Sequence, residues 1–266
     1  MFRYFKLLLT KEQFITYTVV IRDTVKRSAL QMTKNTMSQE EYLTKVKEMK
    51  TSGEKPAKLT DTDFFTVARE RRSVRQYNPD FIISDEDIRE ILEVAIQAPS
   101  SSNIQPWRFC VIKDQKAKEE LLPIANNQPQ IVTASVVIAV LADIEGYKKA
   151  DEIYGNLVSK GIMTEEIKQS YVNTIVSHYG NLDSENAIKV AMTDGGLVSM
   201  QLMLAAKAKG FDTVAMGGYD ENKFVEAFNI PKNLKPVMLI SLGEGAVAGF
   251  EKTRLPLDSI LTWNKF

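Results

Sequence analysis

Ten residues in the middle of the chain, Ala98-Pro-Ser-Ser-Ser-Asn-Ile-Gln-Pro-Trp107, separate a helical pattern from a strand pattern. The helical spacing before them ends at Pro99, and the apolar run over residues 107–113 predicts a strand. Three serines and an asparagine lie between two prolines, which predicts a stiff loop dense in short hydrogen-bonding groups. The loop is either an ordinary turn or a ligand loop that offers hydroxyls and an amide to the heteroatom edge of a planar ring.

The segments around this loop alternate between helical and strand patterns. Upstream, Ser84-Asp-Glu-Asp87 has the form of a capping box and begins a helix. Further helices are predicted over residues 61–71, 147–159, 164–178, 184–209 and 221–228, and further strands over residues 134–142, 212–216 and 235–242. Gly210 is placed to end the longest helix. Because helices outnumber strands and are not strictly paired with them, the pattern favours an α+β fold over a Rossmann fold.

The composition is that of a folded globular protein. Of the 266 residues, 44% are hydrophobic and 26% are charged, which excludes collagen-like, mucin-like and wholly disordered chains. The 34 basic residues balance 34 acidic residues, so no net charge attracts nucleic acid or an anionic membrane. The longest truly apolar run, residues 134–142, is far shorter than the roughly 20 residues of a membrane span. We therefore expect a soluble protein that binds no nucleic acid.

The chain has one cysteine, Cys110, and one histidine, His178. This excludes internal disulfides, all-cysteine metal sites and His-rich metal sites, and it suits a reducing compartment such as the cytoplasm. We expect Cys110 to be a buried, inert thiol within its strand and His178 to have a surface or core role. Catalysis must then rest on a bound cofactor, on carboxylates, or on hydroxyl and amine groups.

The N-terminal part of the chain differs in pattern from the rest. We expect residues 1–59 to be an extension and residues 60–266 to be the main domain. Residues 1–36 carry seven basic and two acidic side chains, which fits a transit or membrane-surface segment, or upstream sequence that adds nothing to the fold. Residues 38–50 predict a helix, and Thr51-Ser-Gly-Glu-Lys-Pro56 predicts a linker.

Three further motifs carry groups that suit a phosphorylated, planar ligand. Arg71-Arg72-Ser73-Val74-Arg75 places a hydroxyl between guanidinium groups, and such a set binds phosphate well. Lys252-Thr-Arg254 adds two cations near the C-terminus. Val214-Ala-Met-Gly-Gly-Tyr-Asp220 takes a strand into paired glycines, which let a backbone N–H approach a flat ligand. Each motif alone is also explained by a solvated surface or a plain turn, and the sequence contains neither the dinucleotide fingerprint nor a Walker A motif.

Together and in this order, the four motifs resemble those of the nitroreductase family of FMN-dependent oxidoreductases, over about residues 63–261. The arginine motif and the loop over residues 98–107 are the most specific pieces. The resemblance implies a helix-rich α+β fold, a three-layer α/β/α sandwich around a mixed, mainly antiparallel sheet. It also implies a domain-swapped homodimer that binds two FMN molecules at the subunit interface, with long helices crossing between protomers.

The resemblance further implies which residues bind FMN. The phosphate would be held by Arg71, Ser73, Lys252 and Arg254, with Arg72 near the phosphate or the ribityl chain and Arg75 near the pyrimidine edge. The other subunit would contribute Pro99, Ser100, Ser101 and Asn103, with Gln105 at the edge of that loop. The strand end that faces the ring would be Ala215, Met216, Gly217 and Gly218, with a backbone N–H directed at flavin N5. Many members have a glutamate where Gly217 stands, so here only the backbone can act.

The implied activity is hydride transfer from NAD(P)H through flavin N5 to nitroaromatic, quinone or similar acceptors by a ping-pong mechanism, without a catalytic acid–base residue or a metal. Two alternatives remain open: a flavin-binding protein without turnover, for storage or sensing, and a same-fold enone reductase or dehalogenase. The helical insert over residues 144–182 would line the substrate side. The sequence does not choose between NADH and NADPH.

Overall fold

The computed structural model describes residues 53–56 and 58–266. The leader over residues 1–36 and the helix predicted over residues 38–50 lie outside the described residues. The described residues all belong to one compact unit. The carbonyl of Glu54 accepts a hydrogen bond from the backbone N–H of Ala248 at 2.8 Å, so the segment before residue 60 already contacts this unit. A domain boundary at residue 60 stays a prediction.

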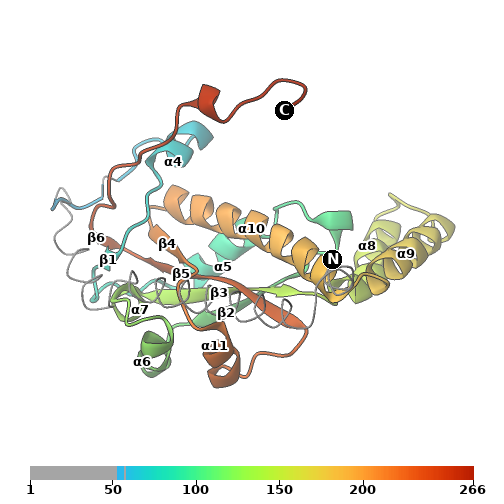
Figure 1. Ribbon diagram of the computed structural model, residues 1–266, viewed down its shortest axis with the longest axis horizontal. Coiled ribbons are helices and arrows are strands. Elements are labelled where there is room, and N and C mark those ends of the chain that lie inside the picture. Colours follow the sequence, from blue (N-terminus) through green and yellow to red (C-terminus); the bar gives the residue numbers. More distant parts are fainter. Residues whose placement is uncertain (1–52, 57) are drawn as a thin grey trace, which may run out of the picture. The chain divides into compact units, whose positions relative to one another are not determined.

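A four-stranded sheet lies at the centre of this unit (Figure 1). Its strands follow the order β2 (Trp107–Ile112), β3 (Val136–Asp143), β5 (Leu234–Gly243) and β4 (Asp212–Met216), and each neighbouring pair is antiparallel. An isolated parallel bridge joins Ser73 to Thr213 of β4. Two short strands, β1 (Gln76–Tyr77) and β6 (Gly245–Val247), form a separate antiparallel pair. The mixed, mainly antiparallel sheet is confirmed.

Helices cover both faces of the sheet, which confirms the three layers. One face is covered by α5 (Asp85–Ala95) and α10 (Ser184–Ala208), and the other by α6 (Gln115–Ile124), α7 (Gln130–Thr133) and α11 (Glu221–Ala227). Every residue of β3 is buried, and its side chains alternate between the two layers. Ile138 and Val140 join one core cluster, whereas Val137 and Ala139 join the other.

The ends of two predicted helices follow from local chemistry. The Ser84 hydroxyl accepts a hydrogen bond from the backbone N–H of Asp87 at 3.0 Å, so the predicted cap of α5 is confirmed. At the end of α10, Gly210 adopts a φ of 87°, and the N–H of Phe211 donates to the carbonyl of Ala206 at 2.9 Å. This is the Schellman arrangement that favours glycine, so the predicted end of α10 is confirmed as well.

One expectation about the segments beside the loop was wrong, and two helices were not predicted. The helix that was expected to end at Pro99 ends at Ala95, because the N–H groups of Gln97 and Ala98 bond back three residues in a tighter turn. Pro99 also disfavours a helical backbone conformation at Ala98, the residue that precedes it. The sequence reading missed α6, although the Asp114 carboxylate accepts from the N–H of Ala117 at 3.0 Å and caps it. It also missed the short helix α7.

The remaining helices lie near the predicted positions: α4 (Phe64–Glu70), α8 (Ala150–Ser159) and α9 (Glu165–Gly180). The helices α8 and α9 form the predicted insert and have a small core of their own, in which Tyr154, Val172 and Ile175 surround Ile104. Since Ile104 belongs to the loop after Pro99, this insert helps to position that loop. No helix within residues 53–56 and 58–266 is long and apolar enough to span a bilayer.

The expectations for Cys110 and His178 have mixed outcomes. Cys110 is only partly buried, because its side chain lies at the margin of a core cluster rather than inside it. That partial burial raises the pKa of the Cys110 thiol, which disfavours the reactive thiolate. His178 is exposed on α9, next to the ring of Tyr179, which confirms its surface role.

The close packing of α10 on β5 depends on Gly195. A Cβ at this position would lie 2.6 Å from a methyl group of Val237. We expect Gly195→Ala to lower the free energy of unfolding by about 1–3 kcal/mol through overpacking. Gly155→Ala is the matched control, since a Cβ there meets only the end of the Lys168 side chain at 4.0 Å. It should stabilise α8 by about 0.5–1 kcal/mol. Urea unfolding of both variants checks this, and equal stabilities would contradict it.

Candidate functional site

The segment near the C-terminus passes directly against the arginine motif. A Cβ at Gly249 would lie 2.7 Å from the carbonyl oxygen of Ser73, so only glycine permits this approach. The Arg72 guanidinium donates to the carbonyl of Phe250 at 3.2 Å, and the Lys252 ammonium donates to the carbonyl of Arg69. Two motifs that are almost 180 residues apart in sequence therefore lie together.

These motifs form a cluster of like charges, which we call the cation cluster: Arg71, Arg72, Lys252 and Arg254. Burial, and then the charge of Arg254, lowers the pKa of Arg71. Burial, followed by the three arginines, lowers the pKa of Lys252, and Glu70 opposes this only weakly. None of the four cations forms an ion pair with a carboxylate in the described part of the chain. The folded chain thus holds positive charge that an anion would neutralise.

Two hydrogen-bonding groups at this cluster also have no partner within residues 53–56 and 58–266. The Nε atom of Arg71 is buried without a hydrogen bond, which is costly for a polar group. The Ser73 hydroxyl makes no hydrogen bond either, although the Ser73 carbonyl accepts from Arg75 at 3.3 Å. Unpaired donors beside unpaired cations are what a phosphate group requires, so these residues fit a phosphorylated cofactor.

The titration of Lys252 gives a test of the cluster without any ligand. Because its pKa is lowered in the folded protein, the unfolded chain binds more protons, and the penalty disappears as the pH rises toward the ordinary value of 10.5. We expect the stability of the unliganded wild type, relative to that of Lys252→Met, to rise as the pH approaches 10.5. Urea unfolding at several pH values measures the difference. A difference that stays constant would show that the pKa of Lys252 is not lowered in the folded protein.

Arg75 also lies beside the C-terminal segment, but it contacts an aromatic ring of that segment. Its guanidinium carbon lies 5.8 Å from the centre of the Phe250 ring, which is within the range of a cation–π contact. Together with its hydrogen bond to Ser73, this contact fixes Arg75 between the two motifs. The sequence reading missed Phe250, which no phosphate motif would indicate.

The glycine motif is brought beside the arginine motif by β4. The N–H of Val74 donates to the carbonyl of Thr213 at 3.1 Å, so the two segments run side by side. Gly217 and Gly218 are exposed, and a Cβ at either would meet nothing within 4 Å. The Gly218 carbonyl accepts hydrogen bonds from two side-chain amides, those of Asn126 at 2.8 Å and Gln128 at 3.0 Å. This turn is therefore both open to a ligand and fixed in place.

Two neighbours of these glycines differ in what they can offer a ligand. Ala215 is exposed at the end of β4, whereas the Met216 side chain is buried and its sulfur lies 3.4 Å from the amide nitrogen of Gln130. Only the backbone of Met216 can therefore face a ligand.

The serine-rich loop contains the short 3-10 helix η1 (Ser101–Asn103) and exposes Pro99 and Asn103. The Ser100 hydroxyl accepts a hydrogen bond from the N–H of Gln105 at 3.0 Å, which closes the loop on itself. The loop is anchored to Asp194 of α10 through Ser101. Asp194 was not predicted, although a carboxylate beside two glycines in the middle of an Ala- and Met-rich helix was a usable signal.

The structure does not join this loop to the other site residues. No hydrogen bond or ion pair within the described residues connects the loop over residues 99–105 with the arginine motif or with residues 252–254. Figure 1 shows α4 and the C-terminal segment beside one end of α10, and the loop between α10 and the insert formed by α8 and α9. One chain thus provides two separate groups of predicted site residues.

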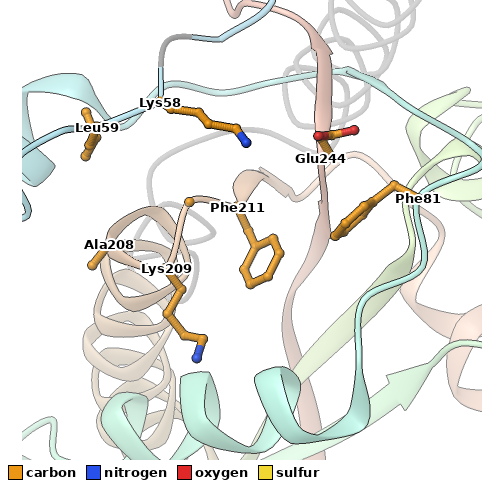
Figure 2. A pocket seen from close by; sticks show the side chains of 8 residues that line it. Lys58, Leu59, Phe81, Ala208, Lys209, Phe211 and Glu244 are labelled. Atoms are coloured by element: carbon orange, nitrogen blue, oxygen red, sulfur yellow. The ribbon is translucent and has the colours of Figure 1, made fainter.

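A cavity of about 300 Å³ lies near the C-terminal end of α10 (Figure 2). Its aromatic wall is formed by Phe81 and Phe211, whose ring centres are 5.9 Å apart. Lys209 at its edge is paired with Asp87 and Glu90. None of the predicted site residues lines this cavity. Within the described residues, moreover, no cluster of His, Cys, Asp and Glu side chains suits a metal ion.

Comparisons with known proteins point to one family. The model of the nitroreductase family matches residues 68–244. A Bacillus subtilis protein named "Putative NAD(P)H nitroreductase YdgI" is 45% identical over 207 residues, which cover 77% of this chain and 99% of that protein.

Two further relatives extend the comparison. A crystal structure of a nitroreductase-type protein from Exiguobacterium sibiricum, in complex with FMN, is 42% identical, covers 78% of this chain and all of that one, and superposes with a TM-score of 0.74. An enone reductase of Lactiplantibacillus plantarum is 30% identical over 199 residues, which cover 74% of this chain and 92% of that protein.

Proposed function

We propose that this chain, which belongs to the nitroreductase family of oxidoreductases, binds FMN and uses NAD(P)H to reduce nitroaromatic, quinone or similar acceptors by a ping-pong mechanism. The observation that carries the proposal is the cation cluster with its unpaired Arg71 Nε. When bound, FMN supplies the redox chemistry, accepting electrons from NAD(P)H and passing them to the acceptor. The protein then contributes binding, orientation and electrostatics.

The phosphate of FMN is assigned to the cation cluster. Arg71 would donate from its buried Nε, and Ser73 would donate its free hydroxyl. Lys252 and Arg254 would supply charge from the C-terminal segment, while Arg72 uses part of its guanidinium to hold that segment in place. Arg75 would direct its positive charge at the pyrimidine edge of the ring, where a cation favours the reduced cofactor.

The ring itself is assigned to two backbone segments. The end of β4 and the turn after it would present the peptide groups of Ala215, Met216, Gly217 and Gly218 to one edge of the ring, since no side chain of the turn obstructs the approach. The loop formed by Pro99, Ser100, Ser101, Asn103 and Gln105 would come from the partner subunit. This arrangement explains how one chain can hold the two groups of residues apart while one cofactor contacts both.

A homodimer is supported by exposed apolar side chains. The segment after Arg254 exposes much of Leu255, Leu257, Ile260, Leu261, Trp263 and Phe266. Trp263 alone is 79% exposed, and the middle of α10 adds Leu197 and Met200. Such a surface on a folded chain is typical of an interface between subunits. A second copy of this chain would cover it and would bring the serine-rich loop to the cation cluster.

The flavin spectrum tests the proposal. Protein saturated with FMN is mixed anaerobically with NADH or NADPH, and we expect the yellow absorbance to bleach and then to return when a nitroaromatic or a quinone is added. Flavin that remains bound but is not bleached by either nucleotide would contradict the reductase and would favour a storage or sensing protein.

Reduction of an enone is the second candidate, favoured by the similarity to the Lactiplantibacillus plantarum enzyme. Both activities would use the same FMN-binding residues. The difference would therefore lie in the residues of α8 and α9 that line the acceptor-binding side. An acceptor panel with the prereduced enzyme discriminates the two. Reoxidation by an enone, with little reoxidation by nitroaromatics and quinones, would replace the leading proposal with this one.

A further inference from the structure

The serine-rich loop has an unusual backbone. Ser102, Asn103 and Gln105 adopt φ values of 44°, 50° and 46°, although none of them is glycine. Side chains with a Cβ rarely occupy this left-handed region, and three such residues within four positions are not explained by turn chemistry alone. Strained backbone persists only where the surrounding structure holds it, so some group outside the loop must fix these residues.

The group that fixes the start of this strained segment is Asp194. Asp194 lies in the middle of α10 and is only 2% exposed. Both carboxylate oxygens accept from the backbone N–H of Ser101, at 3.1 and 3.0 Å, and Oδ1 also accepts from the Ser101 hydroxyl at 3.1 Å. The loop, which is 93 residues away in sequence, is thus tied to the long helix through a single carboxylate.

Within the part of the chain that the structure describes, Asp194 has no hydrogen-bond partner other than Ser101. Burial raises the pKa of Asp194, the two hydrogen bonds from Ser101 oppose this, and no cation is paired with it in the described part of the chain. A buried carboxylate without a cation is costly, and its solvation here comes from the loop. Its side chain is therefore better explained by holding Ser101 than by stabilising α10.

The insert supports the same loop from the other side. The Tyr154 hydroxyl donates to the carbonyl of Ser102 at 3.1 Å, and the Tyr179 hydroxyl shares a hydrogen bond with the Ser102 hydroxyl at 3.0 Å. The bond between the two hydroxyls is exposed, whereas the three contacts of Asp194 with Ser101 are partly buried and have a charged acceptor, so this bond contributes less. Asp194 remains the strongest attachment of the loop.

We propose that Asp194 is a positioning residue, which fixes residues 101–105 in the conformation that the loop presents to FMN. The inference rests on the proposed function. It also refines the role of Ser101: because the Ser101 hydroxyl donates its proton to Asp194, its oxygen can only accept, and it would meet an N–H group of the ring rather than a carbonyl.

The first measurement is amide hydrogen exchange of residues 100–105 in the FMN-free protein. In Asp194→Ala the Ser101 N–H loses its acceptor, so exchange of the loop should become at least about tenfold faster. Asp194→Asn keeps an oxygen that can accept from this N–H and should exchange nearly as the wild type does. The control is Ser199→Ala, which removes a buried hydroxyl of α10 that donates to the Gly195 carbonyl; it should leave the loop unchanged.

The second measurement is the dissociation constant of FMN for the same variants. We expect Asp194→Ala to weaken binding about tenfold, with Asp194→Asn within about threefold of the wild type and Ser199→Ala unchanged. If Asp194→Ala does not fold, as judged by circular dichroism, Asp194→Ser takes its place, since its side chain is too short to reach Ser101.

The outcomes separate this inference from the proposed function. A wild type that binds FMN, with an alanine variant that binds it equally well, overturns the positioning role alone. Loop exchange that is the same in the wild type and the alanine variant also overturns it. If the wild type does not bind FMN, the proposed function fails and takes this inference with it.

Discussion

Arg71→Ala is expected to weaken FMN binding roughly ten- to hundredfold, which is about 1.5–3 kcal/mol for a charge-assisted contact. We expect a loss of this size because Arg71 is half-buried and its Nε has no other partner among the described residues. Burial also lowers the pKa of Arg71, so its charge is poorly solvated without an anion. A phosphate is the partner that would satisfy all of these conditions. The dissociation constant, measured by quenching of flavin fluorescence, checks the expectation.

The matched control is Arg89→Ala, which removes an exposed arginine of α5 whose charge acts on Asp85 rather than on Arg71 or Lys252. It should leave the dissociation constant unchanged. Arg254→Ala should weaken binding less than Arg71→Ala does, because Arg254 is exposed and its charge is screened by solvent. If Arg71→Ala and Arg89→Ala bind FMN equally well, the assignment of the phosphate to this cluster is wrong.

Ending the chain after Arg254 is expected to abolish both dimerisation and FMN binding. This truncation keeps Lys252 and Arg254, so the cation cluster stays complete, but it removes the exposed apolar side chains from Leu255 to Phe266. Without them, the subunits should separate, and the cluster should lose the serine-rich loop of its partner. Light scattering gives the mass, and flavin absorbance gives the occupancy.

The control for the truncation is Asp258→Ala, which changes an exposed polar residue of the same segment and should affect neither property. A truncated protein that is monomeric but still saturated with FMN would show that the loop acts within its own chain. A truncated protein that stays dimeric would show that the interface lies elsewhere, for example on the exposed side chains of α10.

Much of the fold could be predicted because its signals are local. The capping box at Ser84 and the glycine at position 210 act through neighbouring backbone groups, so their sequence context contains the necessary information. The helix α6 was missed because it follows a strand directly, contains Pro123, and has its clearest signal in the single cap Asp114. The end of α5 was misplaced because a tighter turn replaced its last residues.

The site was only partly accessible from the sequence. The motifs identified the residue types, and the structure brings the arginine motif, the C-terminal cations and the glycine turn together. What no spacing could indicate is how they are held. The close pass at Gly249, the ring of Phe250 and the carboxylate of Asp194 all depend on contacts between segments that are distant in sequence. Such contacts follow from packing rather than from local pattern.

The central claim is that two copies of this chain bind FMN between the cation cluster of one subunit and the serine-rich loop of the other. The most direct test is to incubate the purified full-length protein with FMN and to measure mass by light scattering and flavin absorbance together during size-exclusion chromatography. We expect one flavin per chain, co-eluting with a species of twice the chain mass. Protein that elutes without flavin after saturation, or a monomer that carries a full complement of flavin, would contradict the account.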